Sequence, residues 1–253
     1  MKHFIYLYYG FPSKIEEKIE LIKNNKFNGV FLFWDGYFLN NVGKIKEANL
    51  EIETVHLPFD NCNELWVPGK KGDDYVETII EAIKQISSEG IKTVIFHVSS
   101  GDMPPSYNEF GLMRLEKILK VVEEHRVYFA LENLRRLDYL DYVYDNLANK
   151  YLKFCFDSGH ANAFTKNIEN FPWEKYQDKL LCVHLHDNNS YTDQHLIPFR
   201  GNINWQLLAQ KLKEINYQGP LTCEAVNTNS LNNEREYVEE IKLSLERIES
   251  YMG

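Results

Sequence analysis

Short apolar segments rich in β-branched and aromatic residues recur eight times along the 253-residue chain and alternate with amphipathic segments. Several are apolar almost throughout, which is typical of parallel strands covered on both faces. Strand followed by helix, eight times in a chain of this length, predicts an α/β protein with one (β/α)8 barrel domain spanning residues 1–253. The predicted strands are Phe4–Tyr9, Gly29–Phe33, Glu51–His56, Thr93–His97, Tyr128–Glu132, Lys153–Asp157, Leu181–His186 and Leu221–Glu224.

Between these strands, apolar residues recur at three- and four-residue spacing, as on the buried face of a helix. Two connections are long, Asp60–Asp74 and Asn188–Asn204, and both follow the carboxyl end of a predicted strand. Barrel enzymes build their sites on that face, so we expect these loops to be functional. The clearest predicted helices are Lys14–Asn24, Tyr75–Ser88, Leu112–Glu124, Trp205–Ile215 and Val238–Ile248.

The acidic balance of the chain restricts its partners. Its net charge is -9 and its pI about 5.4, which argues against nucleic acid as a partner without excluding it. No apolar run approaches the length of a membrane span, and the first residues lack the pattern of a signal peptide. Three cysteines, Cys155, Cys182 and Cys223, fall inside predicted strands. We therefore expect buried, reduced thiols and a cytoplasmic protein, either monomer or homo-oligomer.

Six of the eight histidines lie at the carboxyl ends of predicted strands or in the segments that follow them, beside acidic residues. Imidazole and carboxylate groups converging from several strands are the ligands of a borderline divalent metal such as zinc or manganese. The pattern therefore predicts a metal centre at the mouth of the barrel. The candidate ligands are His56, His97, Glu132, Asp157, His160, His184, His186, Asp193, His195 and Glu224.

Each of these residues also has a structural explanation. Asp157 precedes a predicted turn and is a natural helix N-cap, and a core imidazole is the alternative for His160, but metal binding is favoured for both. His184 and His186 are two apart on one strand, so both should face the barrel interior, where they need polar partners or a metal. Asp187 follows directly and is predicted to orient them.

A second set of residues is predicted to contact substrate. His160 belongs to it, and Trp34 and Trp66 fall beyond strand ends, where aromatic rings can form the floor of a sugar site; core packing explains both tryptophans equally well. The default expectation for Arg135, Arg136 and Arg200 is a solvated surface charge. The alternative is binding of a phosphate or carboxylate, since all three lie near the same face.

Three motifs carry a resemblance that runs from His56 to Glu224. Residues 156–162 (FDSGHAN), 184–188 (HLHDN) and 201–205 (GNINW) resemble the signatures of the xylose-isomerase-like barrels. That superfamily includes sugar-phosphate isomerases and epimerases and also endonuclease IV. The resemblance implies the barrel and a metal site, and it leaves the substrate open.

Resemblance to the isomerases and epimerases implies one divalent ion held by two Glu, an Asp and a His. The matching residues are Glu132, Asp157, His184 or His186, and Glu224. Glu132 and Glu224 would be the catalytic pair that moves a proton through an enediolate of a sugar or sugar phosphate. This is the first-ranked prediction.

Resemblance to endonuclease IV implies three zinc ions and cleavage of abasic DNA. All nine ligand positions of that enzyme are filled with the required residue type, which brings in His56, His97, His160, Asp193 and His195. The acidic charge and the sequence Ile197–Arg200, where the repair enzymes have Gly-Glu-Gly, place this alternative second. The cofactor prediction is therefore one to three divalent ions. A non-catalytic metal-binding barrel is the third alternative.

Overall fold

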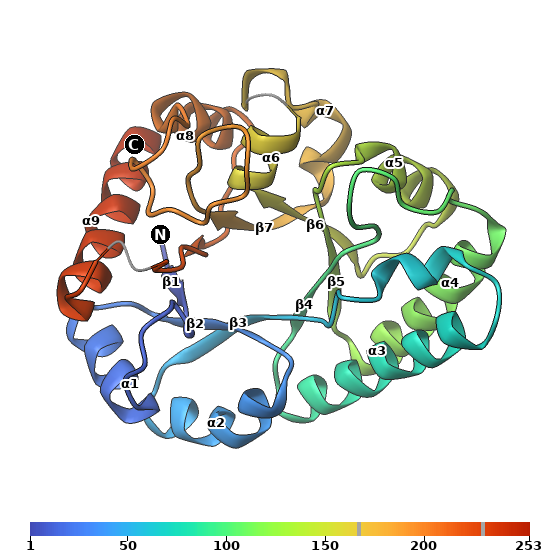
Figure 1. Ribbon diagram of the computed structural model, residues 1–253, viewed down its shortest axis with the longest axis horizontal. Helices are drawn as coiled ribbons and strands as arrows, with labels where there is room; N and C mark the ends of the chain where they lie inside the picture. The colour runs from blue at the N-terminus through green and yellow to red at the C-terminus, as the bar shows by residue number, and fades with distance from the viewer. Residues whose placement is uncertain (166–167, 229–230) are drawn as a thin grey trace.

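The computed structural model describes residues 1–165, 168–228 and 231–253. Eight parallel strands follow one another around a closed barrel, and β8 pairs with β1 to complete it (Figure 1). The predicted (β/α)8 barrel is confirmed. The strands are β1 (His3–Tyr6), β2 (Gly29–Phe33), β3 (Glu51–His56), β4 (Thr93–Phe96), β5 (Tyr128–Glu132), β6 (Leu152–Asp157), β7 (Leu180–Leu185) and β8 (Leu221–Cys223).

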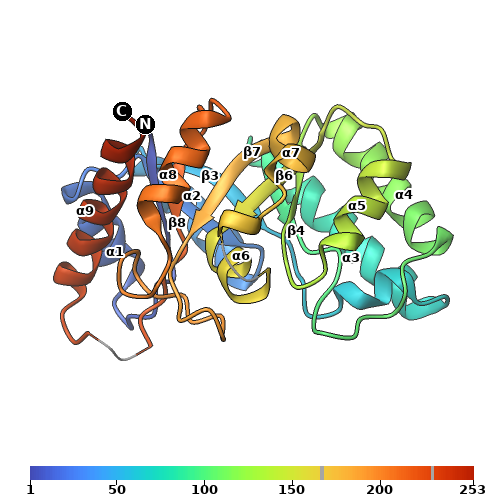
Figure 2. The same cartoon turned by 90° about the horizontal axis from the view of Figure 1, so that it is seen from above.

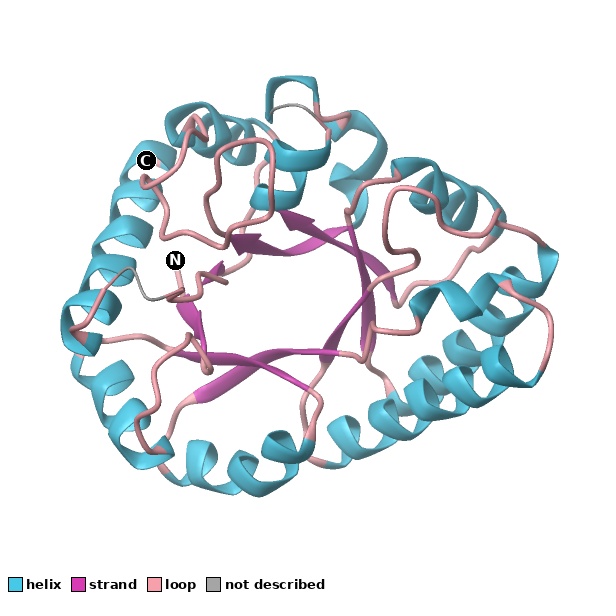
Figure 3. Ribbon diagram, viewed as in Figure 1, coloured by secondary structure: helices cyan, strands magenta, loops and turns pink. Residues whose placement is uncertain are grey.

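Helices form a ring outside the strands (Figure 3). Their apolar faces pack against the outer faces of the strands and make the large core of the molecule. The described helices are α1 (Ile15–Asn24), α2 (Gly36–Glu47), α3 (Lys70–Ser88), α4 (Glu109–His125), α5 (Leu137–Asn146), α6 (Ser158–Phe164), α7 (Trp173–Tyr176), α8 (Trp205–Glu214) and α9 (Glu234–Met252), with 3₁₀ turns η1 (Cys62–Trp66), η2 (Ile168–Asn170) and η3 (Gln177–Lys179).

The connection Asp60–Asp74, predicted to be a loop, is largely helical, which corrects that prediction. It contains η1, and α3 begins at Lys70. Arg114 of α4 explains the order: its buried guanidinium donates to the carbonyl oxygens of Glu64, Leu65, Val67 and Gly69. Arg114 thus provides hydrogen-bond donors for four backbone carbonyl groups of the segment and holds the segment against α4.

The two faces of the barrel differ. Helix α6 and the β7–α8 loop lie at one end, and the chain termini lie at the other (Figure 2). Inside the barrel, Ile95, Ala130, Cys155 and Cys182 form a separate buried cluster below the mouth. All four cysteines are free and buried. Within the described part of the chain, no helix has the length and apolar character to cross a membrane.

Candidate metal centre

Four side chains converge at the centre of the mouth: Glu132 ends β5, Asp157 ends β6, His184 lies on β7 and Glu224 follows β8. Each offers one ligand atom, and the four atoms lie within 4.8 Å of one another. The His184 Nδ1 atom is 2.6 Å from Glu132 Oε1 and 3.0 Å from Glu224 Oε2. All four residues are buried. We call them the central group.

A second group shares Glu132 and adds His56 and His97 from the ends of β3 and β4. The two Nε2 atoms lie 3.0 Å apart, and that of His97 is 2.5 Å from Glu132 Oε2. His56 is oriented through Nδ1, which lies 2.7 Å from the carbonyl oxygen of Leu57. Such a contact fixes the ring and turns the other nitrogen toward the mouth.

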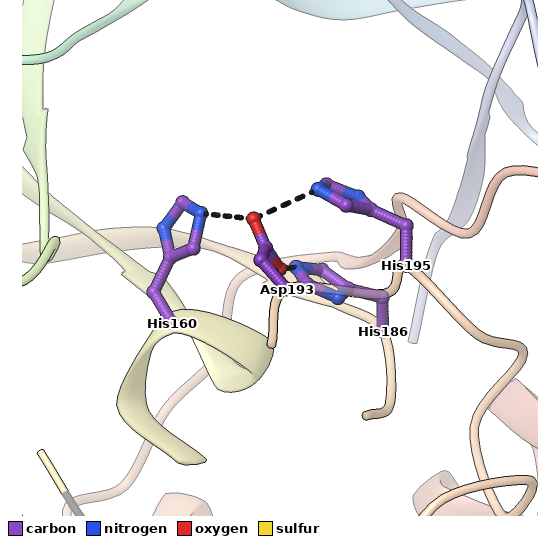
Figure 4. A group of neighbouring side chains, drawn as sticks. All are labelled: His160, His186, Asp193 and His195. Carbon is purple, nitrogen blue, oxygen red and sulfur yellow. Dashed lines mark hydrogen bonds and ion pairs between the residues drawn. The ribbon is translucent and has the colours of Figure 1, made fainter. Parts of the chain in front are cut away.

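A third group comprises His160, His186, Asp193 and His195 (Figure 4). The Nε2 atoms of His160 and His195 each lie 3.2 Å from Asp193 Oδ2. Backbone carbonyls orient both rings, because the two Nδ1 atoms lie 3.0 Å from Asn133 O and 2.9 Å from Glu224 O. The rings of His186 and His195 stack 4.0 Å apart.

The carboxylates and imidazoles strongly perturb one another's pKa values. Burial alone would raise the pKa of Glu224, but His184 beside it brings that pKa down to about 2. Burial likewise opposes ionisation of Glu132, yet His184, His56 and His97 hold its pKa well below the usual range. The pKa of His184 is in turn raised well above its usual value by the two glutamates, against the effect of burial. Buried negative charge here therefore demands a positive partner, which is either a proton or a metal ion.

The residues present fit a divalent ion. Imidazole nitrogen and carboxylate oxygen together are the donor set of zinc and manganese. Two buried atoms, His184 Nε2 and His186 Nδ1, have no hydrogen-bond partner among the described residues, so neither ring is fully used by protein contacts. The close packing of the site has a backbone cause: a Cβ added at Gly159 would lie 1.9 Å from His186 Cε1. Only glycine lets α6 approach that ring.

Asp157 caps a helix, as its sequence position suggested, and its second carboxylate oxygen faces a histidine. Its Oδ1 accepts from the backbone N–H of His160 and caps α6, while its Oδ2 lies 3.0 Å from His186 Nε2. Asn133 holds the Asp157 backbone through two hydrogen bonds: its side chain accepts from the Asp157 N–H and donates to the Asp157 carbonyl oxygen. Sequence reasoning missed Asn133, although its place directly after Glu132 at a strand end was a usable signal.

Asp187 does not orient the histidines, and that prediction is wrong. Its buried carboxylate accepts from the backbone N–H groups of Asn188, Phe199 and Ile203 and from Trp205 Nε1, at 2.8–3.1 Å. It anchors the loop after β7 instead. This loop carries Asp193 and His195, so Asp187 fixes the third group through the backbone.

A cavity of about 450 Å³ opens above these groups. Tyr6, Tyr8, Phe33 and Phe59 line one part of it, and acidic and imidazole side chains of all three groups line another. A separate hollow of about 630 Å³ lies around the starts of β1 and β3 and includes none of the candidate ligands. Because candidate ligands line the cavity at the mouth, we take it as the candidate active site.

The described lining of this cavity includes His160 but not Trp34, Trp66 or Arg200, whose contact with substrate stays a prediction. Trp66 is buried in η1, where its Nε1 donates to Val98 O and its ring packs beside Gly111. Trp34 Nε1 donates to a side chain of α3. Arg200 pairs with an acidic residue of α9. Of the substrate residues predicted, His160 lines the cavity.

The chain belongs to the xylose isomerase-like TIM barrel family, whose model matches residues 19–247. An uncharacterised protein of Methanocaldococcus jannaschii is 27% identical and covers 90% of this chain and 85% of that protein. A solved D-tagatose 3-epimerase-like protein is 26% identical with a TM-score of 0.76, covering 100% of both chains. A probable endonuclease 4 of Mycoplasma mycoides is 27% identical and covers 62% of this chain and 59% of that protein.

Proposed function

We propose that the protein is a divalent-metal-dependent sugar or sugar-phosphate isomerase or epimerase that moves a proton through an enediolate. One observation carries the proposal: Glu132 and Glu224 reach the same atom, His184 Nδ1, at the floor of a cavity of about 450 Å³. Two carboxylates beside one ion site are what a two-base proton transfer requires. The full-length likeness to a D-tagatose 3-epimerase-like protein supports the same class.

The side chains divide the work in this proposal. An ion held by Glu132, Asp157, His184 and Glu224 would polarise the carbonyl and hydroxyl oxygens of the sugar. Glu132 and Glu224, whose pKa values are lowered, are ionised at neutral pH and accept the proton from the carbon next to the carbonyl. The aromatic side chains of Tyr6 and Phe33 cover the sugar and exclude water.

An endonuclease IV-like phosphodiesterase is the second candidate. Two observations favour it: three groups of candidate ligands lie at one barrel mouth, two of them sharing Glu132, and the sequence is similar to a probable endonuclease 4. The acidic net charge opposes it. So does the cavity, where Arg135 is the one arginine or lysine among the described lining residues.

Solvent-proton exchange tests the first proposal. Free and phosphorylated ketoses are incubated in deuterated water with metal-loaded protein, and deuterium on the carbon next to the carbonyl is measured. We expect incorporation by the wild type and its loss in Glu132→Gln and Glu224→Gln. No incorporation from any ketose under metal-replete conditions contradicts the proposal.

A further inference from the structure

We propose that the substrate carries an anionic group, phosphate or carboxylate, at the end remote from its carbonyl, and that Arg135 binds this group. The inference rests on the proposed function and names its substrate class.

Arg135 lies three residues beyond Glu132, on the loop that leaves β5, and its side chain lines the cavity. Its guanidinium carbon stands 3.9 Å from the centre of the Phe164 ring. The same ring stacks on His160, with centroids 5.5 Å apart and planes 22° apart. The cationic group is therefore placed at the cavity wall, separated from the third group by one aromatic ring.

The guanidinium is available to a ligand. Its one hydrogen-bonded partner among the described residues is Asp102, at 2.9 Å through Nη1, and the Asp102 side chain is 80% exposed. An ion pair with so exposed a partner is weak, so an oxyanion in the cavity can replace Asp102 at little cost. The neighbouring Arg136 differs, since it is held by Asp138 through two nitrogen atoms and lies outside the described cavity lining.

The geometry suits an oxyanion more than a neutral hydroxyl. A planar guanidinium offers parallel N–H donors that match phosphate and carboxylate, and its contact with the Phe164 ring holds it at the cavity wall in advance. The cavity supplies carboxylates and imidazoles at its floor, near the proposed reacting carbons. An anion repelled by Glu132 and Glu224 finds its favourable place at the opposite end of the substrate, beside Arg135.

The test compares three ketoses of equal chain length with the metal-loaded protein: one neutral, one with a terminal phosphate and one with a terminal carboxylate. Solvent-deuterium exchange gives kcat and KM for each. We expect the wild type to prefer an anionic ketose, and the better of the two identifies the anion. Arg135→Gln should lower kcat/KM for that ketose by roughly 10- to 100-fold, mainly through KM, and leave the neutral ketose unchanged. Arg136→Gln, the matched control, should change neither.

Two results overturn the inference. If the wild type uses the neutral ketose as well as the anionic ones and Arg135→Gln alters none of them, the substrate class is wrong although the proposed function stands. If no ketose exchanges deuterium, the proposed function fails, and calorimetric binding of inorganic phosphate to metal-loaded protein then decides the role of Arg135. Weaker binding in Arg135→Gln than in the wild type keeps the anion site, and equal binding removes it.

Discussion

Replacing Gly159 with alanine should distort the candidate metal centre at His186 without removing any candidate ligand. The added Cβ would lie 1.9 Å from Cε1, 2.3 Å from Nδ1 and 2.6 Å from Nε2 of His186, where ordinary contacts begin at 3.4 Å. The ring or α6 must therefore move by roughly 1.5 Å. His186 is fully buried and its Nε2 lies 3.0 Å from Asp157 Oδ2, so the ring cannot move away without disturbing its packing or this contact.

Overpacking of this kind costs about 1–3 kcal/mol. For a chain of 253 residues this corresponds to a decrease in melting temperature of roughly 2–12 °C. Displacing His186 should also weaken metal binding by the central group, because His186 Nε2 contacts the Asp157 carboxylate. Thermal unfolding by circular dichroism, with and without added zinc, measures the first effect, and calorimetric titration with zinc measures the second.

Gly43 supplies the matched control. It lies inside α2, where an added Cβ meets nothing within 4 Å, so Gly43→Ala should gain about 0.5–1 kcal/mol from helix propensity and leave zinc binding unchanged. If Gly159→Ala melts at or above the wild-type temperature and binds zinc equally well, the argument that glycine is required beneath His186 is refuted.

Three further substitutions test other parts of the account. Asp187→Asn replaces the carboxylate that accepts from N–H groups after β7 with an amide. We expect the free energy of unfolding to fall by about 1–3 kcal/mol and proteolysis within residues 188–204 to become faster. Glu224→Gln should lower zinc affinity and abolish deuterium exchange, and full retention of both would remove Glu224 from the site. Burial raises the pKa of Glu53 from 4.5 to about 7, so its contribution to stability is present below pH 4.5 and is lost as pH rises through 7. Denaturant titrations of metal-free protein should show Glu53→Gln losing less stability over this interval than the wild type, and an identical pH dependence would contradict the shift.

The barrel could be predicted from sequence because parallel strands buried on both faces leave continuous apolar runs. Errors lie at element ends that tertiary contacts decide. The run Phe4–Tyr9 is apolar throughout, yet β1 ends at Tyr6. The start of α3 could not be predicted because Lys70–Asp74 is polar and lacks an apolar periodicity. The segment before it is stabilised by Arg114, which lies on another helix.

The convergence of the candidate ligands was also predictable, since the carboxyl ends of all strands meet at one rim. Their grouping was not, because side-chain direction at strand ends depends on packing. The sequence predicted Trp66 at the rim, whereas in the structure the Trp66 ring is buried in the space left by the missing side chain of Gly111. Asp187 likewise has the spacing of a residue that orients histidines, and only the fold of the following loop shows that it binds four N–H groups there.

The central claim, that one ion in the central group supports proton transfer, is tested most directly by adding zinc or manganese stepwise to metal-free protein. Deuterium exchange into a ketose and cleavage of abasic-site DNA are measured at each step. The account predicts that exchange saturates at one equivalent of metal and that the DNA stays intact. Exchange that never appears, with DNA cleavage rising until three equivalents are bound, would contradict it and establish the phosphodiesterase.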